Sequence, residues 1–360
     1  MVSTEGVTSC VLEAVLSHLL LSCALLFAAV AAICWYIRDS RTVDGLGRKC
    51  VFITGCDSGF GNLLARRLDR KGVRVIAACL TEEGAAALAA AASPALRTLL
   101  LDVTDSRRVA RAAQVVRAEV GERGLWGLVN NAGRAVPIGP TEWMQKEDFD
   151  RVLDVNLVGV IDVTLRLLPL LKRARGRVVN VASVLGRLSL VGGGYCLSKW
   201  GVEAFSDSLR YQAGCSRVHP RICLTGCRLL PLPRRDMHHF GIKVSIIEPG
   251  FFKTAVTRLD LIEADLKRLW TRLPAHVRDS YGATYCDDYI KSQEFSMNLL
   301  CSSDLSKVTG CMEHALTARF PRTRYGAGWD AKLLWIPLSY LPSFVSDRFT
   351  SALLPSYGHK

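Results

Sequence analysis

The longest hydrophobic segment of the chain lies near its N-terminus, at residues 15–37, where only Ser17, His18 and Ser22 interrupt an apolar run. A helix of this length spans roughly 34 Å, enough to cross a bilayer. No Lys or Arg precedes the run, whereas basic residues follow it at Arg38, Arg41, Arg48 and Lys49. A cleavable signal peptide is the alternative. The length of the run and the missing basic N-terminal region favour a retained anchor, with the rest of the chain on the cytosolic side.

Beyond residue 49, apolar runs of strand length alternate with amphipathic segments. Residues 50–54 predict a buried strand, and Leu63, Leu64 and Leu68 predict the helix that follows it. Further strands are predicted at 73–79, 98–101, 125–129 and 243–247, with a helix at 84–92. This order is typical of an α/β fold with a doubly wound parallel sheet of the Rossmann type. We expect that domain at 50–330, an anchor and basic linker at 1–49, and an apolar, membrane-associating segment at 331–360.

A glycine-rich loop joins the first predicted strand to its helix and reads Gly55-Cys56-Asp57-Ser58-Gly59-Phe60-Gly61. Strand, glycine loop and helix in this order direct backbone N–H groups and a helix N-terminus at a pyrophosphate. Asp57 lies in the loop, and no Lys or Arg lies in it or just after the second strand. A 2′-phosphate requires a cation there, so the sequence favours NAD over NADP. Asp102, after the third strand, is a candidate partner for the adenine amine.

Tyr195 and Lys199 are four residues apart, so on a helix their side chains share one face. A neighbouring ammonium lowers the pKa of a phenol from its usual value near 10, as a general base at neutral pH requires. Ser183 can hydrogen-bond the substrate oxygen that Tyr195 deprotonates. Taken alone, the pair is a weak signal that is better explained as two ordinary residues on a helix surface, and the motifs that accompany it along the chain favour the catalytic interpretation.

Composition narrows the range of partners. The formal net charge is +13, but Lys and Arg are scattered and are not interleaved with aromatic residues. This argues against nucleic acid and favours an anionic membrane surface. Thirteen cysteines without a Cys-x-x-Cys pair argue against a disulfide framework. Pro220 interrupts the only metal-like spacing, so no metal site is predicted at Cys215, His219, Cys223 and Cys227.

Residues 211–234 interrupt the helix that carries Tyr195. The apolar series of Val202 and Leu209 continues at Met237 and Phe240 when this segment is removed, so the sequence predicts an insertion into a core helix. Its three prolines forbid a continuous helix across it. One interpretation is an isoform-type insertion that is extruded as a loop or damages the fold. The other is a regulatory or binding loop.

The region at 259–300 is expected to be a mostly helical substrate lid. Its bulky residues suit an apolar substrate and suit an ordinary core equally well; they include Leu261, Leu266, Trp270 and Leu273. Residues 333–354 are rich in Leu, Trp, Phe and Pro. Because Pro337 and Pro342 break this stretch, we expect it to lie in a membrane interface and not to span the bilayer.

Five motifs together resemble the short-chain dehydrogenase/reductase family: TGCDSGFG, LDVTD, NNAG, YCLSK and Glu248-Pro249-Gly250. The text around them, including GLWGLVNNAG, GVEAFSDSLR and EPGFF, is similar to the membrane-anchored retinol and hydroxysteroid dehydrogenases over residues 51–342. The resemblance implies that Ser183 polarises the substrate oxygen, that Tyr195 is the acid/base, that Lys199 lowers its pKa and holds the ribose, and that Asn156 holds a relay water. The expected cofactor contacts, with Tyr195 and Lys199, are Gly55, Asp57, Ser58, Gly59, Phe60, Gly61, Asp102, Val103, Asn130, Ala132, Gly133, Pro249, Gly250 and Thr254.

The resemblance implies NAD-dependent hydride transfer from a lipophilic alcohol, with all-trans-retinol favoured and a 3α- or 17β-hydroxysteroid as the alternative. A protein with the same fold, inactivated by its insertion, is the other class that stays open. The implied partners are the lipophilic substrate and a membrane, with a homodimer left open. The implied location is the endoplasmic reticulum membrane, held by a single-pass anchor.

Overall fold

The computed structural model describes residues 4–211, 240–254 and 257–351. The chain divides into two compact units, one of Met1–Asp44 with Thr317–Pro321 and one of Gly45–Leu316 with Arg322–Lys360. The predicted insertion at 211–234, apart from Tyr211, lies outside the described residues, as does the Cys215, His219, Cys223 and Cys227 series.

The smaller unit contains the N-terminal helix α1 (Thr4–Ser40). Its segment Leu16–Ser40 has a mean hydropathy of 2.3 and is not buried within the described structure, so by length and composition it is able to cross a membrane. After α1 the backbone pairs with a short segment of the same unit: Thr42 bridges Ala318, and the Arg319 N–H donates to the Arg41 carbonyl at 2.7 Å.

The described residues of the larger unit form a parallel sheet of seven strands in the order β3-β2-β1-β4-β5-β6-β7. This confirms the predicted doubly wound α/β fold. The strands β1, β2 and β6 begin within a residue of their predicted starts, whereas β5 and the four-residue β7 were not predicted. The strands are β1 (Cys50–Thr54), β2 (Arg74–Cys79), β3 (Arg97–Leu100), β4 (Gly127–Asn130), β5 (Arg177–Val181), β6 (Lys243–Pro249) and β7 (Arg324–Ala327).

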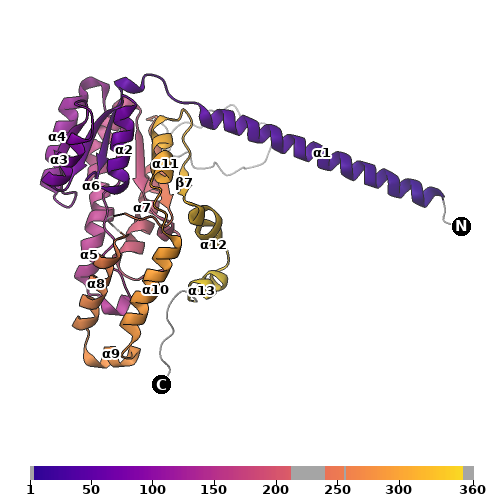
Figure 1. Cartoon of the computed structure of the whole chain (residues 1–360). Coiled ribbons are helices and arrows are strands. Elements are labelled where there is room, and N and C mark those ends of the chain that lie inside the picture. The colour runs from indigo at the N-terminus through magenta and orange to yellow at the C-terminus, as the bar shows by residue number, and fades with distance from the viewer. Residues whose placement is uncertain (1–3, 212–239, 255–256, 352–360) are drawn as a thin grey trace, which may run out of the picture. The chain divides into compact units, whose positions relative to one another are not determined.

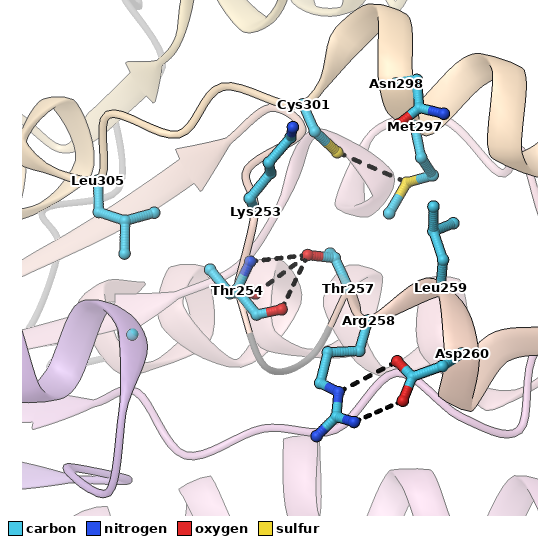
Figure 2. Close-up of a pocket in the computed structure, with 11 residues that line it drawn as sticks. Lys253, Thr254, Thr257, Arg258, Leu259, Asp260, Met297, Asn298, Cys301 and Leu305 are labelled. Carbon is cyan, nitrogen blue, oxygen red and sulfur yellow. Dashed lines mark hydrogen bonds and ion pairs between the residues drawn. The ribbon is translucent and has the colours of Figure 1, made fainter.

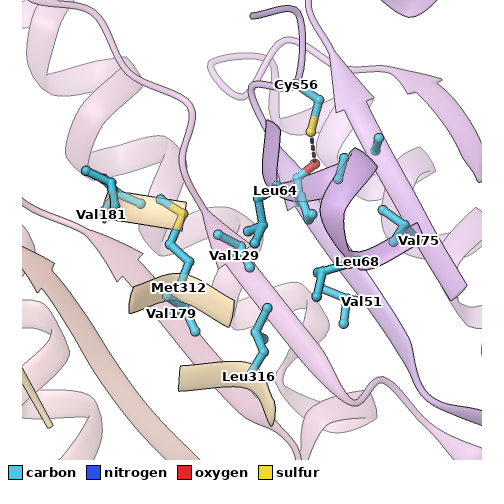
Figure 3. Packing of buried hydrophobic residues seen from close by; sticks show 14 of the residues in the cluster. Val51, Cys56, Leu64, Leu68, Val75, Val129, Val179, Val181, Met312 and Leu316 are labelled. Atoms are coloured by element: carbon cyan, nitrogen blue, oxygen red, sulfur yellow. Dashed lines mark hydrogen bonds between the residues drawn. The ribbon is translucent and has the colours of Figure 1, made fainter. Parts of the chain in front are cut away.

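Helices cover both faces of the sheet (Figure 1). On one face α2 and α11 pack on the strands, and Figure 3 shows Leu64, Leu68, Met312 and Leu316 against strand valines such as Val129. The opposite face is covered by α4, α6 and the end of α7. Because helices cover both faces of the sheet and side chains alternate between these faces, strands such as β1 and β2 are largely apolar on both sides and form nearly continuous hydrophobic runs. The helices concerned are α2 (Gly59–Arg70), α3 (Glu82–Ala90), α4 (Ser106–Val120), α5 (Lys146–Leu153), α6 (Gly159–Ala174), α7 (Gly194–Tyr211) and α11 (Ser306–Thr317).

The expected helical region after β6 consists of α8 (Leu259–Arg272), α9 (Ala275–Tyr281) and α10 (Tyr285–Leu300), grouped at one end of the sheet (Figure 1). It has a core of its own, in which Trp143 contacts Trp270, Tyr281, Tyr285 and Tyr289. Leu266 and Leu273 are buried in this core. Most of the bulky residues of this region therefore form an ordinary hydrophobic core, which was one of the two interpretations that the sequence left open.

The last described elements are the π-helical turn η8 (Ala331–Trp335), α12 (Ile336–Leu338) and α13 (Ser343–Ser351). Trp335 and Leu338 are buried against Val184 and Leu185, next to the end of β5. A domain boundary at residue 331 therefore cuts through packed core. The physical reason is that the apolar residues of this segment divide into two sets: some are buried in the core, whereas others, such as Leu333 and Phe344, remain 76% and 75% exposed.

Candidate active site

A cavity of about 570 Å³ lies at the carboxyl ends of the strands, where β1 and β4 are neighbours and the order of the strands reverses. In open α/β sheets such a switch point is where ligands bind. The cavity is lined by most of the predicted site residues, namely Gly55, Asp57, Ser58, Gly59, Phe60, Asp102, Val103, Ala132, Gly133, Ser183, Tyr195, Lys199, Pro249, Gly250 and Thr254.

Glycines shape the loop between β1 and α2. Gly55 has φ +70°, and a Cβ there would lie 2.7 Å from the Ala132 Cα. A Cβ on Gly61 would lie 2.3 Å from the Gly55 carbonyl oxygen, so Gly61 does not line the cavity but lets α2 pack on the loop. Ser58 begins α2 without capping it through its side chain. The helix N-terminus therefore faces the cavity with N–H groups that suit a pyrophosphate, and the loop fits a dinucleotide.

The Asp57 carboxylate joins the glycine loop to the end of β2. It accepts hydrogen bonds from the backbone N–H groups of Leu80 and Thr81, each at 2.9 Å, and from the Thr81 hydroxyl at 2.8 Å. All three residues line the cavity. A fixed negative charge therefore lies at this end of the cavity, which suits ribose hydroxyls and repels a phosphate.

Ser183, Tyr195 and Lys199 come together from two elements. Ser183 follows β5 and begins the short turn η5 (Val184–Gly186), where its hydroxyl accepts from the Leu185 N–H at 3.2 Å. Tyr195 and Lys199 lie one turn apart in α7, as predicted, and a hydrogen bond joins the side chains of Ser183 and Tyr195. A serine hydroxyl and a phenol thus face the same space, where both can contact one substrate oxygen.

Burial shifts the pKa values of Tyr195 and Lys199, the two catalytic candidates on α7. It raises the pKa of Tyr195 to about 12, with the hydrogen bond from Ser183 opposing the shift, and it lowers the pKa of Lys199 to about 8. The sequence predicted a lowered phenol pKa, and the structure has the opposite direction. The Lys199 ammonium lies 5.5 Å from the centroid of the Tyr195 ring and donates to the Val181 carbonyl at 2.9 Å. Desolvation of the phenolate therefore outweighs its attraction to the ammonium.

Asn156 lies in a π-helical turn, η4 (Asp154–Val158), between α5 and α6. Its amide oxygen accepts from the Arg134 N–H at 2.8 Å, and its amide nitrogen donates to the Arg134 carbonyl at 2.9 Å and to the Ser198 hydroxyl at 3.0 Å. Arg134 lines the cavity and Asn156 lies behind it. Asn156 thus holds the loop after β4 in place, and its role in holding a relay water stays a prediction.

The two asparagines after β4 require a correction. Asn130, predicted to contact the cofactor, points away from the cavity and donates to Thr164 and Asn180. Its neighbour Asn131, which was not among the predicted cofactor contacts, lines the cavity and donates to the carbonyls of Thr54 and Gly55. Successive side chains of a strand point to opposite faces, so only one of the two asparagines is able to face the glycine loop. This alternation predicts that one of the two faces the loop, but it does not by itself show which one.

A second cavity of about 570 Å³ adjoins the first and shares Gly59, Thr254 and Thr257 with it (Figure 2). The Thr257 hydroxyl donates to the Phe252 carbonyl at 2.7 Å and accepts from the Thr254 N–H at 2.9 Å. Arg258 is paired with Asp260, so its charge is already balanced. Among the described residues no group of His, Cys, Asp and Glu is arranged to hold a metal ion.

Comparisons with known proteins agree with this geometry. A family model described as short chain dehydrogenase matches residues 49–231. Retinol dehydrogenase 7 of Rattus norvegicus is 56% identical over 310 residues, covering 86% of this chain and 90% of that protein. The 17-beta-hydroxysteroid dehydrogenase type 6 of Homo sapiens is 51% identical over 321 residues, covering 89% and 93%. A solved short-chain dehydrogenase from Streptomyces avermitilis has the same fold, with a TM-score of 0.58 at 24% identity over 84% of this chain and 93% of that one. The chain therefore belongs to the short-chain dehydrogenase family.

Proposed function

We propose that this protein oxidises a lipophilic alcohol with NAD, and that all-trans-retinol is the preferred substrate. The observation that carries the proposal is the convergence of Ser183, Tyr195 and Lys199 on one cavity that also contains the glycine loop. The likeness to retinol dehydrogenase 7 supports the choice of retinol. The likeness to a 17-beta-hydroxysteroid dehydrogenase keeps 3α- and 17β-hydroxysteroids as the second candidate.

The side chains around the cavity have distinct roles in this proposal. The Ser183 hydroxyl holds the substrate oxygen, and the Tyr195 phenolate oxygen accepts the alcohol proton. Lys199, which carries its charge below pH about 8, supplies the positive potential that opposes the burial of that phenolate. A nicotinamide dinucleotide held in this cavity would supply the acceptor for the hydride that leaves the carbinol carbon. The glycine loop and the start of α2 would hold its pyrophosphate, and this binding would position it for reaction.

Membership of the family makes the cofactor a nicotinamide dinucleotide. We propose NAD in particular because the Asp57 carboxylate lies against Leu80 and Thr81, at the end of β2. The described cations that line the cavity are elsewhere: Lys199 is bonded to Val181, and Arg134 donates to the Val136 carbonyl at 3.0 Å. A 2′-phosphate beside Asp57 would therefore meet a carboxylate without a compensating cation.

We also propose that α1 anchors the protein in the endoplasmic reticulum membrane, with the larger unit on the cytosolic side. The hydropathy of Leu16–Ser40 and the basic residues after it support this orientation. Side chains of the last described segments add a second apolar surface that suits a membrane interface, including Leu333, Tyr340 and Phe344. A substrate that partitions into the bilayer fits such a location.

One assay tests the proposed activity. The full-length protein in detergent, supplied with NAD, is expected to turn over all-trans-retinol faster than 5α-androstane-3α,17β-diol. Tyr195→Phe should lower kcat by about 10²–10⁴-fold, because it removes the proton acceptor, while NAD still raises the Tm of the variant.

Tyr36→Phe, which changes an exposed phenol in the anchor, serves as the control and should leave turnover unchanged. Near-normal turnover by Tyr195→Phe contradicts the assigned mechanism. If the protein binds NAD but turns over neither alcohol, it belongs to the alternative class, in which the fold is retained but the enzyme is inactive.

A further inference from the structure

The turn that follows β6 forms one wall of the cavity, at the end where the reacting groups meet. Pro249, Gly250 and Phe252 line the cavity. The Ser183 hydroxyl oxygen lies 3.5 Å from the Pro249 carbonyl oxygen, so the turn lies beside the group that is proposed to hold the substrate oxygen. A displacement of this turn would therefore change the distances between the reacting groups, on which the rate of hydride transfer depends.

Three hydrogen bonds hold the backbone of this turn. The Gly250 N–H donates to the Ala327 carbonyl at 2.9 Å, and the Phe251 carbonyl accepts from the Ser302 N–H at 3.0 Å. The Phe251 N–H donates to the Asp330 carboxylate at 2.8 Å. Two of the three partners are backbone groups, and the third is a side chain that comes from beyond β7. The position of the Phe251 N–H therefore depends on a single carboxylate.

The same carboxylate explains why residue 250 is a glycine. A Cβ on Gly250 would collide with the carboxyl carbon and both carboxylate oxygens of Asp330. The φ of Gly250 lies outside the left-handed region, so its backbone conformation would tolerate a side chain. A Cβ on Gly328 would meet the Asp330 carboxylate as well. The carboxylate thus occupies the space beside Gly250 that a side chain would otherwise fill.

Asp330 is an unusual residue to bury. It is 1% exposed, and among the described residues it takes part in no ion pair. Burial raises the pKa of its carboxyl group, against the opposing effect of the hydrogen bond from the Phe251 N–H. A buried carboxylate without a paired cation is costly, and hydrogen bonds from backbone N–H groups offset part of that cost. The role of Asp330 is therefore to be sought in the backbone that it holds.

The segment that Asp330 begins supports a second turn of the site. The ring centroid of Trp335 lies 5.8 Å from that of Phe251, on the turn after β6. Trp335 is also buried in one cluster with Val184 of η5, the turn that Ser183 begins. Residues 330–338 thus lie behind both turns that border the reacting end of the cavity.

We propose that Asp330 is a positioning residue: its carboxylate fixes the turn at Gly250 and Phe251, and through this turn it sets the place of the cavity wall beside Ser183. Asp330 does not line the cavity, so it acts through its neighbours. The kinetic consequence rests on the proposed function, whereas the packing of the carboxylate against Gly250 does not depend on any substrate.

The test uses the full-length protein in detergent and compares the native chain with Asp330→Asn, Asp330→Ala, Gly250→Ala and the double variant Gly250→Ala with Asp330→Ala. Asn retains the shape and an acceptor oxygen for the Phe251 N–H, whereas Ala removes the acceptor and empties the space beside Gly250. Asp150→Asn removes a carboxylate from the exposed pair of Lys146 and Asp150 and serves as the control. The measurements are Tm with and without NAD, and kcat and KM with NAD and all-trans-retinol.

Gly250→Ala and Asp330→Ala should each lower the Tm, the first through a steric clash and the second through a cavity and an unpaired N–H. In the double variant the added methyl group enters the vacated space, so the loss of Tm should be smaller than the sum of the two single losses. Asp330→Ala should lower kcat about tenfold while NAD still raises its Tm, and Asp330→Asn should stay within about threefold of the native kcat. A purely structural role would lower the Tm and leave the kcat of the folded enzyme unchanged.

The proposal is wrong if the two Tm losses simply add in the double variant, because the carboxylate then does not occupy the space beside Gly250. It is equally wrong if Asp330→Ala keeps the native kcat. If Asp330→Ala does not fold, Asp330→Asn decides, since a tenfold loss of kcat in that variant contradicts the role of the acceptor oxygen. Tm losses that do not add, in a protein that turns over neither alcohol, support the packing and refute the proposed activity, so the two failures are distinguishable.

Discussion

At the scale of single residues, burial determines more of the site chemistry than the spacing of residues does. Tyr195 and Lys199 are placed one turn apart as their spacing requires, yet desolvation moves both pKa values toward the neutral forms. The cavity in which they meet is apolar on the side of Val155, Val181 and Phe252. Burial therefore favours the neutral phenol of Tyr195, while Lys199, whose pKa is lowered to about 8, still carries most of its charge at pH 7 and opposes the cost of forming the phenolate.

Asp57 allows a prediction at this scale. Asp57→Asn removes the negative charge and retains one acceptor oxygen, so one of the two N–H groups, of Leu80 or of Thr81, loses its acceptor because they bind different carboxylate oxygens. We expect the ratio of kcat/KM for NADP to that for NAD to rise about tenfold, because a 2′-phosphate no longer meets a carboxylate. Steady-state kinetics with both cofactors measures this ratio, and Asp150→Asn is a suitable control. An unchanged ratio would show that Asp57 does not face the ribose.

At the scale of secondary-structure elements, the close contacts of the glycine loop were predictable only in part. The order of strand, loop and helix was predicted from the sequence. In the structure β1 ends at Thr54 and α2 begins at Gly59. The sequence assigned Gly61 to the cofactor, whereas in the structure it allows α2 to approach the Gly55 carbonyl. The glycine pattern indicates that a side chain would not fit at these positions, but it does not indicate which neighbouring atoms the side chain would clash with.

Two glycine substitutions are expected to act in opposite directions. Gly61→Ala forces a Cβ into the Gly55 carbonyl and the Asn131 amide, so it should lower the free energy of unfolding by about 1–3 kcal/mol and weaken the Tm increase caused by NAD. Gly310→Ala, within α11, meets no atom within 4 Å and should raise the free energy of unfolding by about 0.5–1 kcal/mol. Thermal unfolding of both variants provides the comparison. A stabilised Gly61→Ala would contradict the packing role.

At the scale of the whole molecule, the apolar N-terminal helix and the parallel α/β sheet were expected from the sequence, but the packing of residues 331–338 against the end of β5 was not. The boundary expected at residue 331 fails because Trp335 is a core residue packed beside Val184. The polar cluster of Glu203, Glu248 and Arg324 could not be foreseen either, because its members are separated by tens of residues. The parallel pairing of β6 with β7 brings Glu248 and Arg324 together, and the packing of α7 against β6 adds Glu203.

The predicted insertion at 211–234 permits a test at this scale. Deleting it rejoins the apolar series of Val202 and Leu209 with that of Met237, so we expect a several-fold higher yield of soluble, detergent-extracted protein and higher retinol turnover. A chain in which a Gly/Ser segment of equal length replaces the insertion is the control for length alone. If the deletion lowers both yield and turnover, the segment is a structural part of the protein.

The sequence by itself determined the elements and their order, because the periodicity of apolar residues, the glycine spacing and the Tyr195 and Lys199 pair are all local properties of the chain. The tertiary structure decided which asparagine, Asn130 or Asn131, faces the glycine loop, and which charges are neutralised by burial. The physical reason is that desolvation and hydrogen-bond partners depend on residues that are far apart in the chain. Only the packed sheet brings those residues within contact distance.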